Sequence, residues 1–353
     1  MKPWHWLTAI CLVTTSACTT IGYYVQAVSG QTEILVKQQP VQKLVADPVT
    51  PEILKQSLSA VMDILDFAHT DLGLPDNGSY RQYADLQRRY VVWNVVAAPE
   101  FSLQAKQWCY LVVGCLNYHG YFAEQQARDY ARNLSSTGWE VTVNGVSAYS
   151  TLGWFRDPLL NSMLNRERWE IARMLFHELA HQLLYFDGDT DFNEAFADSV
   201  ATIGLQHWLH SQPSAIRETA ELSLQREAAF YNLVLTARDR FATLYASGQP
   251  ATEMRLQKQQ LTSKLQTEYR QLQAGWNGDT RYDTWMQSQI NNAGFSIIST
   301  YRLQVPQFLA AYRQLGSRLP DFYAWAVSLK ACNNPERQQY LQNPNQRVTC
   351  QSY

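Results

Sequence analysis

The chain of 353 residues is long enough to bury a sizeable core, as one large domain or as two. With 46% hydrophobic and 17% charged residues, it has the composition of a globular protein that is somewhat poor in charge. A net charge of −2 without a block of like charges argues against nucleic acid as a partner.

Residues 1–17 have the pattern of a secretory signal. Lys2 gives a short positive start, Leu7–Val13 are mostly apolar, and the small residues Thr15–Ala17 lead to Cys18. Small residues that run into a cysteine resemble the lipobox of bacterial lipoproteins, which implies that Cys18 is lipidated and becomes the mature N-terminus. An ordinary cleaved signal with an incidental cysteine is the alternative.

The residue after this cysteine, Thr19, resembles that of lipoproteins sent to the outer membrane. Later in the chain no run approaches the ~20 apolar residues that span a bilayer. We therefore expect an exported protein of the cell envelope that is attached to the membrane by its lipid and faces the periplasm.

Four cysteines follow the signal, at Cys109, Cys115, Cys332 and Cys350. An even number in an exported chain indicates disulfides, and four cysteines allow three pairings. Proximity in the sequence favours Cys109–Cys115 and Cys332–Cys350, the second of which would hold the C-terminal tail. A cysteine zinc cluster is the alternative, but the C-x-x-C spacing is absent.

Residues 18–50 lack a clear period and predict either a linker or a segment that wraps the domain. From Pro51, a residue suited to the first turn of a helix, apolar positions follow helical spacing, and this helix should stop before Gly73.

A small mixed sheet with a crossing helix should follow. Residues 90–98 and 108–113 are dense in Val, Trp and Tyr and predict strands, and residues 122–135 predict a helix. Trp139–Val143 predicts a further strand, and Asn144–Gly145 predicts a turn.

The second half of the chain is predicted to be mostly helical. We expect one helix over Leu159–Tyr185 and another over Asn193–Ser211. Residues 253–273 are rich in Gln, Lys and Leu with heptad-like spacing. Because this pattern is short, it favours a solvent-exposed helical hairpin over a dimeric coiled coil.

The most informative pattern is H-E-x-x-H at His177–His181, inside the first of these helices. Residues four apart share one helix face, so His177 and His181 can bind one ion, and Glu178 lies beside it. This spacing is typical of zinc metalloproteases, in which the glutamate is the general base. A pair of core histidines without metal is the alternative, although two histidines and a glutamate buried together are costly without an ion.

A catalytic zinc needs a third protein ligand and leaves its fourth position to water. Glu194 follows His181 by 13 residues, which is enough for one helix to end and the next to begin. Asp198 lies at the i+4 position from Glu194, faces the same way and can orient His177, with a solvated helix carboxylate as the alternative. The prediction is therefore one Zn²⁺ per chain.

The segment Asn193–Asp198 resembles the N-E-A-x-x-D motif of gluzincins, the thermolysin-like metallopeptidases. The resemblance implies that Glu194 is the third zinc ligand and that Asp198 hydrogen-bonds the outer nitrogen of His177. The stretch between the two motifs is shorter here than in thermolysin.

More of the chain, from about Trp93 to about Phe308, resembles a family of exported bacterial proteins described as "putative aminopeptidases". The matching stretches are residues 113–115, 118–122 and 148–155, the two zinc motifs, and residues 291–293.

The gluzincin resemblance also implies a strand that aligns the peptide and a second oxyanion donor. In gluzincins the strand before the zinc helix pairs with the peptide backbone, and here the candidate contacts are Gly145, Ala148 and Tyr149. An ordinary strand that ends in a turn is the alternative. Tyr301 is the candidate oxyanion donor, with a core tyrosine as its alternative.

Together these patterns predict an α+β fold: a zincin-like metallopeptidase core with a small mixed sheet and a mostly helical C-terminal region. The domain would span residues 51–353, with a helix and the sheet in 51–158 and the zinc site in the helical part, 159–353.

The expected function is zinc-dependent hydrolysis of peptides by Glu-assisted attack of zinc-bound water, with aminopeptidase activity implied by the family resemblance. A zinc-containing assembly factor or chaperone of the envelope, which binds peptides with little turnover, is the alternative. The sequence leaves the oligomeric state open.

Overall fold

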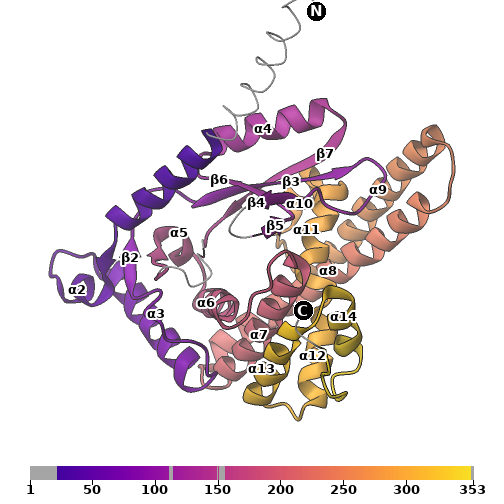
Figure 1. The fold of residues 1–353 in the computed structure, drawn as a ribbon. Coiled ribbons are helices and arrows are strands. Elements are labelled where there is room, and N and C mark those ends of the chain that lie inside the picture. The colour runs from indigo at the N-terminus through magenta and orange to yellow at the C-terminus, as the bar shows by residue number, and fades with distance from the viewer. Residues whose placement is uncertain (1–21, 111–113, 149, 151–155, 351–353) are drawn as a thin grey trace, which may run out of the picture.

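The computed structural model describes residues 22–110, 114–148, 150 and 156–350. Over these residues helices combine with three small sheets, which confirms the α+β class. In Figure 1 the largest sheet lies near the top, and helices α6 (Arg168–Leu183) and α7 (Thr190–His210) lie below it. The predicted signal and Cys18 lie outside the described residues.

The segment before the first predicted helix is itself largely helical. Residues 22–36 form a helix, followed by β1 (Gln39–Pro40) and α2 (Val41–Ala46). Tyr23 stacks on His119 with 4.1 Å between ring centroids, and Ile34 is buried in the main core. Other apolar residues of this helix, such as Val25 and Val28, are exposed, so the pattern shows no single apolar face.

The helix predicted after Pro51 is present as α3 (Glu52–Thr70), with Pro51 at its N-cap. Its buried face follows helical spacing through Leu58, Val61, Ile64, Leu65 and Ala68. The helix predicted over residues 122–135 is also present, as α4 (Glu124–Ser136).

The central sheet has the strand order β6 (His119–Tyr121), β3 (Val92–Pro99), β7 (Trp139–Val146), and both pairings are antiparallel. Helix α4 follows β6 in the chain, precedes β7 and packs on β3 and β7. A second sheet is mixed: β2 (Gln82–Ala84) pairs antiparallel with β1 and parallel with β8 (Leu159–Leu160). Strands β4 (Trp108–Tyr110) and β5 (Gly114–Leu116) form a third, separate pair. The strands expected in one mixed sheet are therefore divided between two: β3 and β7 lie in the central sheet, and β4 lies in the separate pair.

The turn predicted at Asn144–Gly145 is wrong, because β7 continues through both residues, and Gly145 pairs with Trp93 of β3. A Cβ on Gly145 would lie 2.3 Å from ring atoms of Tyr90. A glycine is therefore needed here because an aromatic ring packs closely against the strand. From the sequence alone, an Asn-Gly pair in such a strand cannot be distinguished from one in a hairpin turn.

The single helix predicted over Leu159–Tyr185 is also wrong. The segment begins as β8, continues as the short helix α5 (Asn161–Leu164), and only then forms α6. Glu167 and Glu170 form a capping box that starts α6 at a defined residue. The sequence did not reveal this break, because β8 and α5 also contain buried residues and the periodic apolar pattern continues across it.

The remaining helices lie in the right-hand, central and lower parts of Figure 1. Helices α8 (Ser214–Tyr245) and α9 (Ala251–Gln273) form the hairpin that projects at the right, and its inner side has a separate core around Phe230, Phe241 and Leu265. They are followed by α10 (Asp283–Ser288), α11 (Asn292–Arg302), α12 (Val305–Gln314), α13 (Leu319–Ser328) and α14 (Asn334–Gln342).

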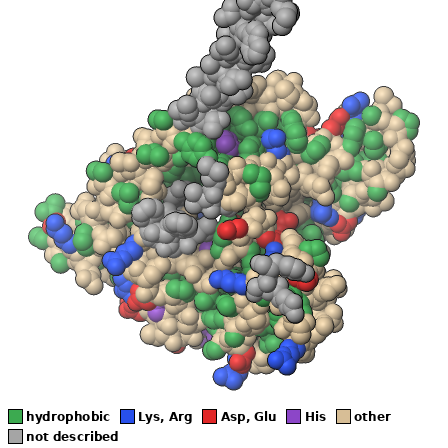
Figure 2. Space-filling model, in the orientation of Figure 1, with side chains coloured by type: hydrophobic (Ala, Val, Ile, Leu, Met, Phe, Trp, Pro, Cys, Tyr) green, Lys and Arg blue, Asp and Glu red, His purple; other side chains and the backbone are tan. Residues whose placement is uncertain are grey.

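None of the helices in the described residues has both the length and the apolar character needed to cross a bilayer. On the face shown in Figure 2, acidic and basic side chains are interspersed, in keeping with the net charge of −2.

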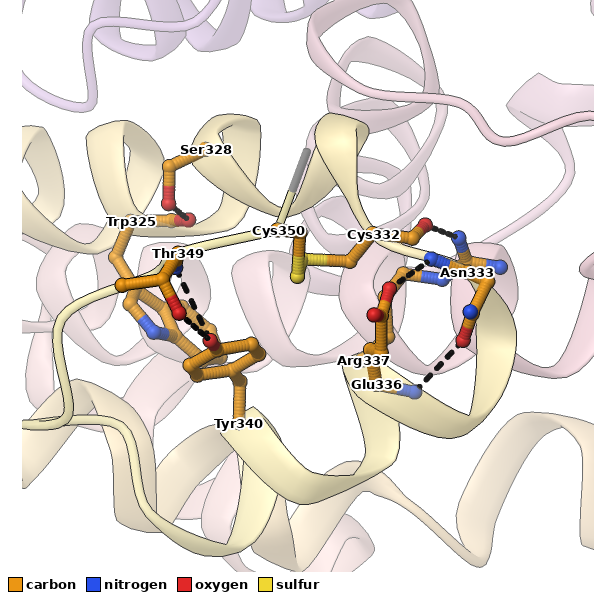
Figure 3. Close-up of a disulfide and its surroundings, with 9 residues drawn as sticks. All are labelled: Trp325, Ser328, Cys332, Asn333, Glu336, Arg337, Tyr340, Thr349 and Cys350. Carbon is orange, nitrogen blue, oxygen red and sulfur yellow. Dashed lines mark hydrogen bonds between the residues drawn. A yellow bond between two sulfur atoms is a disulfide. The ribbon is translucent and has the colours of Figure 1, made fainter. Parts of the chain in front are cut away.

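Two disulfides join Cys109 to Cys115 and Cys332 to Cys350, the pairing expected from proximity in the sequence. Figure 3 shows that the second disulfide lies beside Arg337 of α14, whose Nη1 donates to the carbonyl of Cys332 at 2.6 Å. The Nε of Arg337 donates to Asp189, the N-cap of α7, at 3.1 Å. The C-terminal segment is thus attached to the start of α7.

Replacing Cys332 and Cys350 together by alanine should lower the free energy of unfolding by about 3 kcal/mol, since a loop with a sequence separation of 18 no longer constrains the unfolded chain. Urea unfolding of the oxidised proteins measures the difference. The matched Cys109→Ala, Cys115→Ala variant opens a loop of separation 6 and should lose less, about 2 kcal/mol. A larger loss in this control would contradict the loop-closure explanation.

Candidate metal centre

Helix α6 presents its two histidines toward one point. His177 and His181 lie four residues apart on one helix face, and their Nε2 atoms are 3.1 Å from each other. Both side chains are largely buried, with 14% and 7% of their surface exposed. Two buried imidazole nitrogens that face each other need a shared hydrogen or a cation between them.

Helix α7 supplies a third donor. The Oε2 atom of Glu194 lies 3.2 Å from Nε2 of His177 and 3.4 Å from Nε2 of His181. The turn between the two helices is fixed by Asn193, whose amide accepts from the backbone nitrogen of Phe186 and donates to its carbonyl. Asp189 caps the first turn of α7 by accepting from the backbone nitrogen of Phe192.

The spacing of the three donor atoms fits a tetrahedral ion. Two donors that each lie 2.0–2.1 Å from a tetrahedral zinc are separated by about 3.3–3.4 Å. The distances among His177, His181 and Glu194 run from 3.1 to 3.4 Å. Two nitrogens and one carboxylate oxygen are also the donor set of catalytic zinc sites, so these residues could hold a zinc ion.

The electrostatics of this cluster favour positive charge. Burial opposes a charge on His177, but the carboxylates of Asp198 and Glu194 outweigh it and raise the pKa of this imidazole to about 10. Burial alone would raise the pKa of Glu194, but His181 and His177 outweigh it and lower this pKa to about 2. The pocket therefore stabilises a cation among its donors.

Glu178 lies beside the three donors. Burial raises the pKa of its carboxyl, and the negative charges of Glu194 and Asp157 add to the rise, while the two histidines oppose it. A carboxylate with a raised pKa is a better proton acceptor near neutral pH. Asp157 is 2% exposed, and its carbonyl accepts from the backbone nitrogen of Tyr80 at 2.5 Å.

Asp198 is brought to the outer nitrogen of His177. Its Oδ1 lies 3.6 Å from Nδ1 of His177, and the neighbouring Arg302 has Nη1 2.9 Å from its Oδ2. Burial would raise the pKa of Asp198, but Arg302, His177 and Arg173 outweigh it and hold this pKa far below its ordinary value. The carboxylate is ionised and buried, so the alternative of a solvated helix carboxylate is wrong.

Two tyrosines flank the histidines. The ring of Tyr301 stacks 6.2 Å from the ring of His177, and the ring of Tyr185 meets that of His181 edge-on at 6.4 Å. Burial raises the pKa of Tyr301 well above 10, and the carboxylate of Glu194 adds to the rise. Its hydroxyl therefore stays protonated and can donate a hydrogen bond.

The residues expected to align a peptide are placed less directly. Gly145, in β7, is covered by the ring of Tyr90, and Ala148 packs against the main core. Tyr149 lies outside the described residues. In the described part of the chain β7 pairs with β3 alone, so its other edge has no strand partner there. Such an edge can take up an extended peptide by backbone pairing.

Three residues at the site were not predicted from the sequence. Arg173, Glu227 and Arg302 form an ion-pair network around Asp198. Arg173 lies one helical turn before His177 on the same face of α6, so its helical spacing was an available signal. Glu227 and Arg302 come from α8 and α11, and no local pattern links them to the zinc motif.

Comparison with known proteins gives one match. The model of a family described as "Putative aminopeptidase" matches residues 22–341. This range includes both histidines, the three acidic motif residues Glu178, Glu194 and Asp198, and Tyr301. No curated protein and no solved structure matches the chain.

Proposed function

Because the chain belongs to the "Putative aminopeptidase" family, we propose that it hydrolyses peptides with one zinc ion held by His177, His181 and Glu194. The observation that carries the proposal is the convergence of one oxygen and two nitrogen donors within 3.4 Å of one another on adjacent helices. The family itself suggests peptide hydrolysis, and the donor set supports zinc as the cofactor.

A zinc ion bound there would polarise the scissile carbonyl and make its bound water more acidic. Glu178 would accept the proton of the attacking water and deliver it to the leaving amine. Asp198 would hold the imidazole of His177 in the tautomer whose Nε2 is free to bind metal. Tyr301 would donate a hydrogen bond to the oxyanion of the tetrahedral intermediate.

Replacing Tyr301 by phenylalanine should lower kcat roughly 10²- to 10³-fold with little change in KM, because the lost hydrogen bond is made only in the transition state. Steady-state kinetics on one peptide measure both constants. Tyr185→Phe is the matched control, since this ring lies against the other histidine. If Tyr185→Phe has the larger loss in kcat, the oxyanion role belongs to Tyr185.

The proposed activity is tested with peptides that carry free and acetylated N-termini. An aminopeptidase cleaves only the free ones and loses this activity in a chelator, with recovery when zinc is added back. Cleavage of both sets would indicate an endopeptidase. Chelator-resistant cleavage would overturn the zinc-dependent mechanism.

We also propose that the protein is exported and attached to the outer membrane through a lipid on Cys18. The two disulfides support an oxidising compartment, because such bonds persist outside the cytosol. Labelling cells with a radioactive or clickable fatty acid tests the anchor, and a Cys18→Ser variant should lose the label.

A further inference from the structure

Four charged side chains, one from each of four helices, meet behind the zinc ligands. Arg173 comes from α6, Asp198 from α7, Glu227 from α8 and Arg302 from α11. Arg302 binds Asp198 at 2.9 Å and Glu227 at 2.6 Å. Arg173 binds Glu227 at 2.8 Å and has Nη2 at 3.7 Å from Asp198. Each arginine thus lies between the two carboxylates.

This ion-pair quartet is largely shielded from water. The exposed fractions of its side chains run from 9% for Asp198 to 18% for Glu227. Its formal charges cancel, since two arginines meet two carboxylates. The guanidinium of Arg302 also lies 4.3 Å from the ring centroid of Tyr231, which covers one of its faces.

Burying four ions costs more desolvation free energy than their pairing commonly returns, so a quartet of this kind is weak evidence for stability alone. Its position relative to His177 suggests a more specific use. Arg302 lies at Oδ2 of Asp198, whereas Nδ1 of His177 lies 3.6 Å and Nη2 of Arg173 3.7 Å from Oδ1. The two oxygens of the Asp198 carboxylate therefore have different partners. When Arg302 holds Oδ2, it also determines the direction in which Oδ1 points.

We propose that Arg302 is a positioning residue for the metal centre, acting through Asp198, and that Glu227 holds Arg302 in place and is itself held by Arg173. Arg302 fixes one oxygen of Asp198, so that the other stays directed at the outer nitrogen of His177 and the inner nitrogen stays directed at the metal. Glu227 balances the charge and connects the α8–α9 hairpin to the site. This inference rests on the proposed zinc site.

The test is the zinc affinity of the full chain, measured by competition with a chromogenic chelator. Arg302→Met keeps an unbranched apolar side chain and removes the charged guanidinium, and it should weaken zinc binding roughly 10- to 100-fold, as is typical when a partner of a metal ligand is lost. Arg302→Lys should recover part of the affinity, because an ammonium can still reach Asp198.

Arg240→Met is the matched control. Arg240 also makes a 2.7 Å ion pair between two helices, with Glu268, but within the α8–α9 hairpin. The Arg240→Met variant should have the zinc affinity of the native chain. Glu227→Gln is the second variant, and it serves as the test if Arg302→Met does not fold. Glutamine is nearly identical in shape to the native side chain, and this variant should also weaken zinc binding.

The route through Asp198 is tested in an Asp198→Asn background. There Arg302→Met should have no further effect on zinc affinity, because the residue it acts on is already altered. An equal loss in both backgrounds, or unchanged affinity in Arg302→Met and in Glu227→Gln, would overturn the inference. If the native chain binds no zinc, the proposed function fails instead, so the two failures are distinguishable.

Discussion

Replacing Glu178 by glutamine should reduce peptide hydrolysis by roughly 10²- to 10⁴-fold, the range expected when a general base is lost. Glutamine has almost the same shape as glutamate but cannot accept the proton of the attacking water. Glu178 is not one of the three converging donors, so the zinc content of the variant should stay at the native value. Hydrolysis rates and metal analysis of the same preparation give both readings.

Glu221→Gln serves as the matched control for this substitution, because Glu221 is exposed on α8 and should have native activity when replaced. A Glu178→Gln protein that keeps more than about a tenth of the native rate would show that another group is the base. A variant that rescues a deletion strain while it lacks hydrolysis would instead favour the peptide-binding assembly factor as the physiological role.

Glu194→Ala should remove zinc binding at micromolar concentrations and hydrolysis with it. The third ligand and its negative charge are lost together, so we expect affinity to fall by more than about 100-fold, beyond the effect of residues that only support a ligand. At a zinc concentration of 100 times the native Kd, the native chain gains about 2.7 kcal/mol of stability, and this variant should gain less than about 0.4 kcal/mol. Thermal unfolding with and without added zinc measures the difference.

Asp191→Ala is the control on the same helix. Asp191 is an exposed carboxylate at the start of α7 whose Oδ1 accepts from Thr300 at 2.6 Å, and it is not one of the three converging donors. It should keep the zinc-induced stabilisation. A Glu194→Ala protein that is still stabilised by zinc would assign the ion to a different set of ligands.

The local part of the site was predictable from the sequence because helical geometry places residues four apart on one face. His177 and His181 converge for that reason, and Glu178 lies beside them. Glu194 was predictable because the connection between the two helices is short and leaves few ways for the chain to return. The secondary structure of α3 and α4 followed from apolar periodicity in the same way.

The parts that failed depend on contacts between distant segments. The turn at Gly145 was wrong because the ring of Tyr90, which requires the glycine, lies 55 residues earlier in the sequence. The ion-pair quartet was missed because Arg302 reaches Asp198, and Glu227 reaches Arg302, only after the helices that carry them pack together. Such charges have the same local pattern as solvated helix residues, so no periodicity distinguishes them.

The measurement that tests the account most directly is the zinc content of the purified chain after dialysis against metal-free buffer. Inductively coupled plasma mass spectrometry should give about one zinc per native chain and close to none for Glu194→Ala. Less than about a tenth of an equivalent in the native chain, even after incubation with zinc, would contradict the donor set of His177, His181 and Glu194.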